Sequence, residues 1–364
     1  MYIFIFGITL VFFLLKFKRN GVSIVDPFRV SMPGGQCLAH LLVAFFLIAV
    51  IGLRGIEIGD DTLVYHYRFN LLLHGVQEST QRFFYIEGME FGYYLFQKFS
   101  LSLSGNFSFL LMLSAFLITL PVIFVVHRYS RIPLFSYWIF LTYGFFLASM
   151  ALIRQSIALG FCFLAYHFIV QRKLWLFLIC ITAAFSFHMT SIVFLPFYWL
   201  SRIKYRSFYP VIFLLLLLTV NALFFFTMDE ILQWGAKFSR NVYVVTGTSS
   251  FLKISVFFVC SMLLCVFFTG QYFNSDIILK TSWYSVAIYV APLYATAMSP
   301  ALERLFLYYK LPIILLLPNV AARIESKALR RLFMLFFVAM GFYMYYRNLF
   351  GYDLHYYPYK FFWE

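Results

Sequence analysis

Residues 107–126 read FSFLLMLSAFLITLPVIFVV, a stretch without a single charged side chain. A helix needs about 20 apolar residues to span the hydrocarbon core of a bilayer. Comparable runs cover residues 37–53, 208–227 and 252–269. Backbone polar groups inside a membrane must be bonded within their own segment, so these runs predict transmembrane α-helices.

The composition excludes an ordinary water-soluble protein. Of the 364 residues, 63% are hydrophobic and only 12% are charged, which leaves too few polar side chains to cover a soluble fold of this size. The formal net charge of +14 does not indicate nucleic-acid binding, because Lys and Arg occur in short clusters between apolar runs. We therefore predict an all-α, polytopic membrane protein whose immediate surroundings are lipid.

The sequence lacks the motifs of disulfide-rich, metal-binding and nucleotide-binding proteins. The five cysteines lie inside or at the edge of apolar runs, where thiols behave as small hydrophobic groups. They suggest neither a disulfide framework nor a zinc site. A phosphate-binding Walker loop, a dinucleotide fingerprint and an HExxH motif are also missing from the sequence. We expect no metal and no cofactor.

The basic clusters predict how the helices are oriented, since cytoplasmic loops of membrane proteins are enriched in Lys and Arg. Residues 1–15 are apolar without a cleavage site and are predicted to be the first helix. With residues 16–29 in the cytoplasm, every later cluster also falls there if residues 134–170 and 174–200 each form a helical pair. This scheme gives about 12 helices, range roughly 10 to 14, in a single membrane domain over residues 1–364. The later clusters lie at residues 128–131, 172–173, 202–206, 280 and 323–331.

Two long loops are predicted on the external side of the membrane, at residues 54–105 and 228–251. Both should carry short helices that lie along the membrane interface. In the first loop the expected helices are residues 61–74 and 90–102, which are rich in aromatic side chains and leucine. An aromatic external tail follows residue 346.

The first external loop contains a dense group of ionisable side chains. Asp61 precedes Thr62 at the start of the expected helix, where a carboxylate can cap the helix or take part in chemistry. On that helix Tyr65 and Arg68 share a face, because residues three and four apart are neighbours. A carboxylate, a phenol and a guanidinium could therefore converge here, close to Arg54 in the same loop.

Arg154 and His188 are isolated polar residues between apolar runs. No acid lies near Arg154 in the sequence, and a guanidinium in a membrane segment costs about 3 kcal/mol on insertion scales. Its planar fork suits phosphate or carboxylate, and the alternative is an ion pair with an acid on another helix. His188 is predicted at the external tip of its helical pair, either as an interfacial hydrogen-bonding group or as a base.

Opposite charges also open a helix near the end of the chain. Glu303 is favoured in a first helical turn by the helix dipole, which does not explain the adjacent Arg304. Tyr308 follows on the same helix. Together with Arg54 and Arg154, Arg304 makes three arginines at the external boundary, a set that suits binding of a diphosphate at the membrane surface.

At these residues the chain resembles the EpsG-like, Wzy-type polysaccharide polymerases of bacterial envelopes. The similarity covers most of the chain, and its short motifs occur in the same order. The motifs are Arg54 with Asp61-Thr62 and Tyr65, then Glu90-x-Gly92-Tyr93, Arg154-Gln155 with Ala158, His188-Met-Thr190, and Glu303-Arg304 with Tyr308.

The resemblance implies a membrane-embedded glycosyltransferase of the C type (GT-C) in the bacterial inner membrane. Its donor and acceptor would both be undecaprenyl-diphosphate-linked oligosaccharides, and the growing glycan would be transferred at the periplasmic face. A chain-length regulator protein would be a partner.

Such a reaction needs a base for the acceptor hydroxyl and cations for the departing diphosphate. We predict that Asp61 or His188 is the base, and that Arg54, Arg154 and Arg304 bind the diphosphate without a metal. Further substrate contacts are predicted from Tyr65, Arg68, Glu303 and Tyr308.

Three other functions compete with a polymerase. A ligase would move a finished polymer from the same lipid carrier to another acceptor. A flippase or transporter of lipid-linked sugars should place charged residues along a pathway at mid-membrane, whereas here they gather at one predicted face. A structural scaffold would need a partner acid for each boundary arginine.

Overall fold

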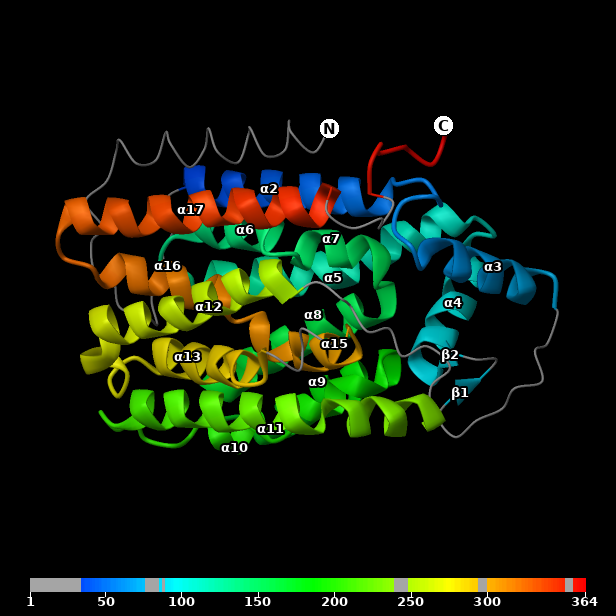
Figure 1. The fold of residues 1–364 in the computed structure, drawn as a ribbon. Helices are drawn as coiled ribbons and strands as arrows, with labels where there is room; N and C mark the ends of the chain where they lie inside the picture. The colour runs from blue at the N-terminus through cyan, green and yellow to red at the C-terminus, as the bar shows by residue number, and fades with distance from the viewer. Residues whose placement is uncertain (1–33, 76–84, 87–88, 239–247, 294–299, 351–355) are drawn as a thin grey trace. The chain divides into compact units, whose positions relative to one another are not determined.

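The computed structural model describes residues 34–75, 85–86, 89–238, 248–293, 300–350 and 356–364 (Figure 1). Helices dominate, and the described strands are β1 (Tyr85–Ile86) and β2 (Met89–Glu90), which pair antiparallel. The predicted all-α fold is therefore confirmed. The predicted helix at residues 1–15 lies outside the described residues. The helices are α2 (Gly34–Gly52), α3 (Thr62–Leu73), α4 (Phe91–Leu103), α5 (Phe107–Tyr129), α6 (Pro133–Thr142), α7 (Phe145–Ala151), α8 (Ile153–Val170), α9 (Leu174–Phe187), η1 (Met189–Phe194), α10 (Phe197–Leu200), α11 (Tyr209–Phe238), α12 (Thr248–Thr269), η2 (Gly270–Tyr272), α13 (Ile277–Val290), α15 (Pro300–Lys310), α16 (Ile313–Arg323) and α17 (Lys327–Phe350).

The chain forms two compact units. Unit 1 comprises residues 1–192 and 326–364, and unit 2 comprises residues 193–325. The boundary falls within η1, just after His188 and the end of α9. The single membrane domain expected from the sequence stays a prediction.

Unit 1 is built on a close contact between helices α5 and α8. Pro121 in α5 has no N–H, so the carbonyl of Leu117 four residues earlier loses its usual helical donor. Gly160 of α8 faces this carbonyl, and a Cβ added there would lie 2.9 Å from the Leu117 oxygen. Small residues allow such close approach of helices in membranes. α2 packs on α5, and α9 packs on α8.

Helices α6 and α7 form one bent apolar pair. They differ in direction by 50°, and Gly144 between them has φ +94°, a backbone conformation that glycine adopts without steric cost. α7 then ends at Ala151, and α8 begins at Ile153. The helical pair predicted for residues 134–170 is therefore present, with its first member broken in two.

Unit 2 contains helices from α11 to α16, in which α13 contacts α12, α15 and α16, and α12 contacts α16. α11 exposes much of its apolar surface, since Leu218 is 64% and Phe226 80% exposed. At the start of α13, the Asp276 carboxylate accepts hydrogen bonds from the backbone N–H groups of Ile278 and Leu279. The same carboxylate pairs with Arg323 of α16 at 3.0 Å.

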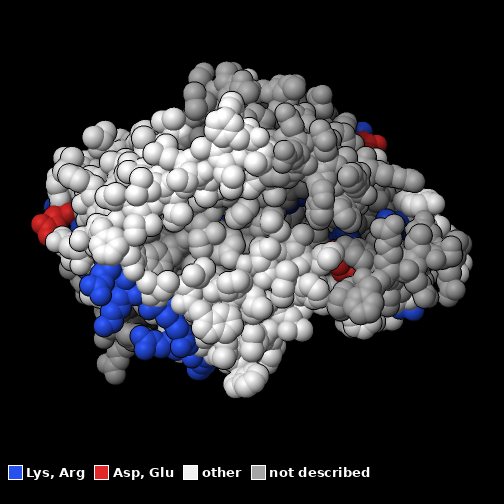
Figure 2. Space-filling view, turned by 60° about the horizontal axis from the view of Figure 1, so that its bottom comes forward, with Lys and Arg blue, Asp and Glu red and all other residues white. Residues whose placement is uncertain are grey.

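Five helices within the described residues are long and apolar enough to cross a membrane, or six if α6 and α7 make one span. Figure 2 shows that uncharged side chains cover most of the visible face, while Lys and Arg gather mainly in one cluster. The protein is thus a membrane protein. The predicted 12 spans are not confirmed, because helices such as α9 and α13 have only 14 residues, whereas spanning needs about 20.

The local predictions can be compared with the structure one by one. The two helices expected in the first loop are confirmed as α3 and α4. The predicted break within residues 174–200 is confirmed at His188, although the second half consists of η1 and the short α10. The predicted loop 228–251 is wrong in its extent, since α11 continues to Phe238 and α12 begins at Thr248.

Candidate active site

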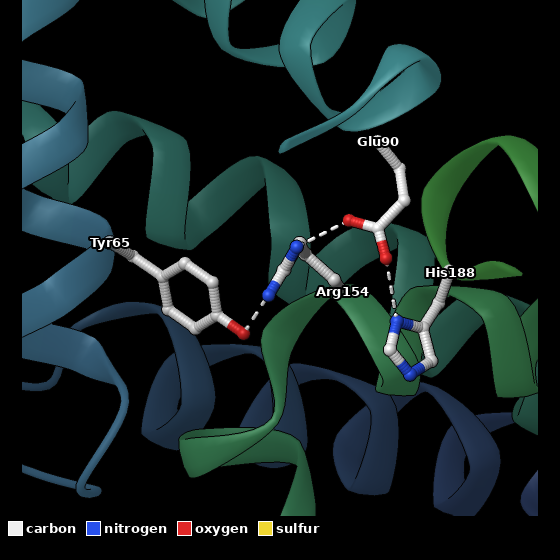
Figure 3. A network of polar contacts seen from close by, with 4 residues as sticks. All are labelled: Tyr65, Glu90, Arg154 and His188. Atoms are coloured by element: carbon white, nitrogen blue, oxygen red, sulfur yellow. Dashed lines mark hydrogen bonds and ion pairs between the residues drawn. The ribbon is translucent and has the colours of Figure 1, made fainter. Parts of the chain in front are cut away.

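A buried carboxylate joins two of the predicted site residues in unit 1. Glu90 ends β2 and directly precedes α4, and its side chain is only 3% exposed. One oxygen, Oε2, pairs with Nη1 of Arg154. The other, Oε1, lies 2.9 Å from Nδ1 of His188. Figure 3 shows the guanidinium and the imidazole on either side of this carboxylate.

Arg154 also contacts α3, in the loop that the sequence predicts to be external. It lies in the first turn of α8, and its Nε donates to the hydroxyl of Tyr65 on α3 at 3.5 Å. The guanidinium carbon lies 5.5 Å from the centre of the Tyr65 ring, within cation–π range. Four segments of unit 1 thus contribute to one cluster, which we name the Glu90 cluster: Tyr65, Glu90, Arg154 and His188 (Figure 3).

The local sequence explains why Glu90 lies beside His188. Gly92, at the start of α4, packs directly on Ser186 near the end of α9, and a Cβ added at Gly92 would lie 2.3 Å from the Ser186 Oγ. α9 ends one residue before His188, whose backbone is extended with φ −154°. This turn away from the helix brings the imidazole to the Glu90 carboxylate.

Exposure differs sharply within the Glu90 cluster. The Glu90 side chain is 3% exposed, whereas those of Arg154 and His188 are 24% and 20% exposed. Among the residues that the structure describes, none accepts a hydrogen bond from Nη2 of Arg154 or forms a hydrogen bond with Nε2 of His188. The cluster therefore presents a cationic group and an imidazole nitrogen above a buried anion.

The electrostatics favour an ionised Glu90. Burial alone would raise the pKa of this carboxyl, but the hydrogen bond from His188 and the charge of Arg154 outweigh it, so the pKa lies below its usual range. Burial raises the pKa of the Tyr65 phenol, an effect that the nearby Arg154 charge only partly offsets. Tyr65 therefore remains a neutral hydrogen-bonding group.

An ionised carboxylate only accepts hydrogen bonds, so Nδ1 of His188 carries the proton in the bond to Glu90. In a neutral imidazole this leaves the lone pair on Nε2. The arrangement can bind an anion at Arg154 and accept a proton at His188.

Arg54 occupies a different environment from Arg154. Its side chain is fully buried, and its guanidinium donates to the backbone carbonyls of Ile51 and, at 2.9 Å, of Met150. Thr62 donates to the same Met150 carbonyl at 3.1 Å. The hydrogen bonds of Arg54 thus connect it to two helix ends, while those of Arg154 connect it to the Glu90 cluster.

The remaining predicted site residues lie on α3 and α15. Asp61 occupies the N-cap position of α3 but makes no capping hydrogen bond with its side chain, and its charge acts on Tyr65. Arg68 is partly exposed on the same helix. On α15, in unit 2, Glu303 and Arg304 are exposed. Tyr308, on the same helix, is buried.

Sequence reasoning omitted Glu90 from the site. Two signals pointed to it: the isolated Arg154 required an acid from another segment, and Glu90 belongs to the Glu90-x-Gly92-Tyr93 motif. Arg154 does pair with an acid, Glu90, which lies at the end of β2 and not within another helix, and its role in binding a diphosphate stays a prediction. Within the described part of the chain, no group of three or more His, Cys, Asp or Glu side chains is arranged to hold a metal ion.

Comparison with known proteins gives one family. The sequence model of the EpsG family matches residues 38–361. This range includes the whole Glu90 cluster as well as Arg54 and α15. No curated protein and no solved structure matches the chain significantly.

Proposed function

Because this chain belongs to the EpsG family, we propose that it is a polysaccharide polymerase that works on lipid-linked sugars. The proposed donor is a growing glycan on undecaprenyl diphosphate, and the proposed acceptor is a fresh repeat unit on the same type of carrier. Transfer takes place at the periplasmic face of the bacterial inner membrane, in a C-type glycosyltransferase without a metal. The family supports a polymerase-like role, and the Glu90 cluster is the observation that carries the chemistry.

In the proposed reaction a hydroxyl oxygen of the acceptor sugar attacks the anomeric carbon of the donor. The bond between that carbon and the diphosphate oxygen breaks, and its electron pair stays with the leaving diphosphate. The hydroxyl proton passes to Nε2 of His188. Glu90 holds His188 through Nδ1, which orients the imidazole and stabilises it once it is protonated.

Arg154 is the proposed cation for the leaving diphosphate. Charge grows on the diphosphate as the glycosidic bond breaks, so a fixed guanidinium stabilises the transition state more than the ground state. Two of its nitrogens are held by Tyr65 and Glu90. This anchoring leaves Nη2 to bond a phosphate oxygen without reorganisation of the side chain.

The other predicted residues enter the proposal as follows. Arg304, exposed on α15, is the second proposed cation for the diphosphate. Asp61 is the alternative base, and Arg68 and Glu303 are proposed sugar contacts. Tyr308 is buried in α15, so we propose that it supports Arg304 and does not touch the sugar. A chain-length regulator is the proposed protein partner.

The test is reconstitution of the purified full chain with a defined undecaprenyl-diphosphate-linked repeat unit, scored for a ladder of oligomers. We expect a ladder with the wild type, no ladder with His188→Ala, and a ladder with Asp61→Asn. Loss of the ladder in Asp61→Asn with retention in His188→Ala would transfer the base role to Asp61. Transfer to another acceptor without a ladder would identify a ligase.

A further inference from the structure

Arg54 is a buried arginine that lies where two helices end. Its two described carbonyl partners, Ile51 and Met150, belong to the last turns of α2 and α7. Carbonyls in a last helical turn lack intrahelical donors and carry the negative end of the helix dipole. A guanidinium at this point bonds to both helix ends and is stabilised by both dipoles.

The same helix end is held by other parts of the first external loop. The hydroxyl of Thr62 shares its one hydrogen between the Met150 carbonyl, at 3.1 Å, and the Ile58 carbonyl, at 2.7 Å. Gly59, with φ +84°, packs so closely on this turn that an added Cβ would lie 2.8 Å from the Met150 oxygen. Three residues of one loop, Arg54, Gly59 and Thr62, thus fit around a single carbonyl.

The C-terminal tail holds this loop from its other side. The backbone N–H of Gly55 donates to the carbonyl of Lys360 at 2.9 Å. The backbone N–H of Phe362 donates to the carbonyl of Leu53 at 3.0 Å. Arg54 and Phe361 are the bridge partners between the two segments. The backbone around Arg54 is therefore fixed on both sides.

The position of this anchor matters because α7 leads directly into the Glu90 cluster. α7 ends at Ala151, Leu152 connects it to α8, and Arg154 is the second residue of α8. A shift of the Met150 turn would therefore move Arg154. A misplacement of about 1 Å at a reacting group can cost about a hundredfold in rate.

We infer that Arg54 is a positioning residue: it fixes the junction between α7 and α8 and thereby aims Arg154, and it does not bind the diphosphate itself. This inference rests on the proposed function and deepens it, because it reduces the predicted three-arginine clamp to Arg154 and Arg304. The Arg54 side chain has 0% exposure, so it presents no surface to a diphosphate.

The test is a double-mutant cycle measured by binding, not by turnover. The dissociation constant of undecaprenyl diphosphate is measured for the purified full chain in detergent, with undecaprenyl monophosphate for comparison. The variants are Arg54→Met, Arg154→Ala and the double variant. We expect Arg54→Met to weaken diphosphate binding by about tenfold in the wild-type background and to have no further effect once Arg154 is Ala, because coupled residues are non-additive.

The outcomes separate the two proposals. If the wild type does not prefer the diphosphate to the monophosphate, both the proposed function and this inference fail. If it does, and Arg54→Met weakens binding equally in both backgrounds, Arg54 acts independently of Arg154 and only the positioning role is overturned.

Two variants with smaller structural changes test the same inference if Arg54→Met does not fold. Thr62→Val removes the second side-chain donor to the Met150 carbonyl and should weaken binding several-fold, again only when Arg154 is present. Arg54→Lys keeps the charge at the helix ends and should restore part of the affinity lost in Arg54→Met. The matched control is Lys327→Gln, which removes an exposed cation at the start of α17 and should leave binding unchanged. Wild-type affinity in Thr62→Val would contradict the inference.

Discussion

Each unit contains an acid at the start of a helix that pairs with an arginine from another helix. In unit 2 Asp276 precedes α13 and pairs with Arg323, and in unit 1 Glu90 precedes α4 and pairs with Arg154. The burial is similar, since the acids are 7% and 3% exposed and the arginines 22% and 24%. The two pairs differ in what the carboxylate does with its other bonds.

Asp276 caps its own helix, accepting from the N–H groups of Ile278 and Leu279. Glu90 occupies the same position before α4 but makes no capping hydrogen bond with its side chain. Its second oxygen bonds to His188 instead. The Glu90 carboxylate is thus bonded to the arginine and the histidine and not to the N–H groups of its own helix.

The two ion pairs should differ most in the effect of replacing the arginine. We expect Arg154→Ala to lower the rate of polymer formation on the order of a thousandfold, because removal of one charge-stabilising donor typically costs a hundredfold to a thousandfold. Arg323→Ala, the matched variant of the other pair, should keep the wild-type rate and lower only the thermal stability. The rates are measured with the reconstituted full chain, and equal rates in the two variants would remove the distinction.

Replacing the acid of each pair should give the next largest difference in rate between the two pairs. Glu90→Gln should lower the rate by about a hundredfold, since general base catalysis contributes at least that factor and the amide orients His188 less well. Asp276→Asn should leave the rate unchanged and cost about 1 to 3 kcal/mol of stability, because Asn keeps the helix cap but removes the charged partner of Arg323. Thermal unfolding of both variants, measured beside the rates, separates the two effects. A slow Asp276→Asn enzyme with normal stability would contradict this division.

The smallest effect is on the pH dependence of stability. The pKa of Glu90 is lowered in the folded protein, so its ionised form stabilises the fold above the usual glutamate pKa of about 4.3, and this contribution is lost as the pH falls through the lowered value. The difference in Tm between the wild type and Glu90→Gln should thus be constant near neutral pH and shrink in acid. A difference that grows as the pH falls would show that Glu90 is not held ionised.

Much of the local structure could be predicted from the sequence. The apolar run at residues 107–126 became α5, and the aromatic segments of the first loop became α3 and α4, because helix length and side-chain pattern are local properties. The break at His188 followed from basic clusters on both sides of residues 174–200. These features depend on nearby residues alone.

Other features depend on contacts that sequence spacing does not contain. The sequence predicts that Arg54 and Arg154 both bind a diphosphate, whereas tertiary packing places one on backbone carbonyls and the other on Glu90. The carboxylate itself was overlooked because it lies 64 residues from its arginine. α11 extends past residue 228, the predicted start of a loop, although Asp229 and Glu230 interrupt its apolar run.

The central claim is that the Glu90 cluster is where the lipid diphosphate reacts. The most direct measurement is an experimental structure of the full chain with bound undecaprenyl diphosphate. We predict a phosphate oxygen at about 2.7 to 2.9 Å from Nη2 of Arg154, as in charge-assisted hydrogen bonds, with the Glu90–His188 contact intact. A diphosphate bound elsewhere, with Arg154 contacting only Tyr65 and Glu90, would contradict the account.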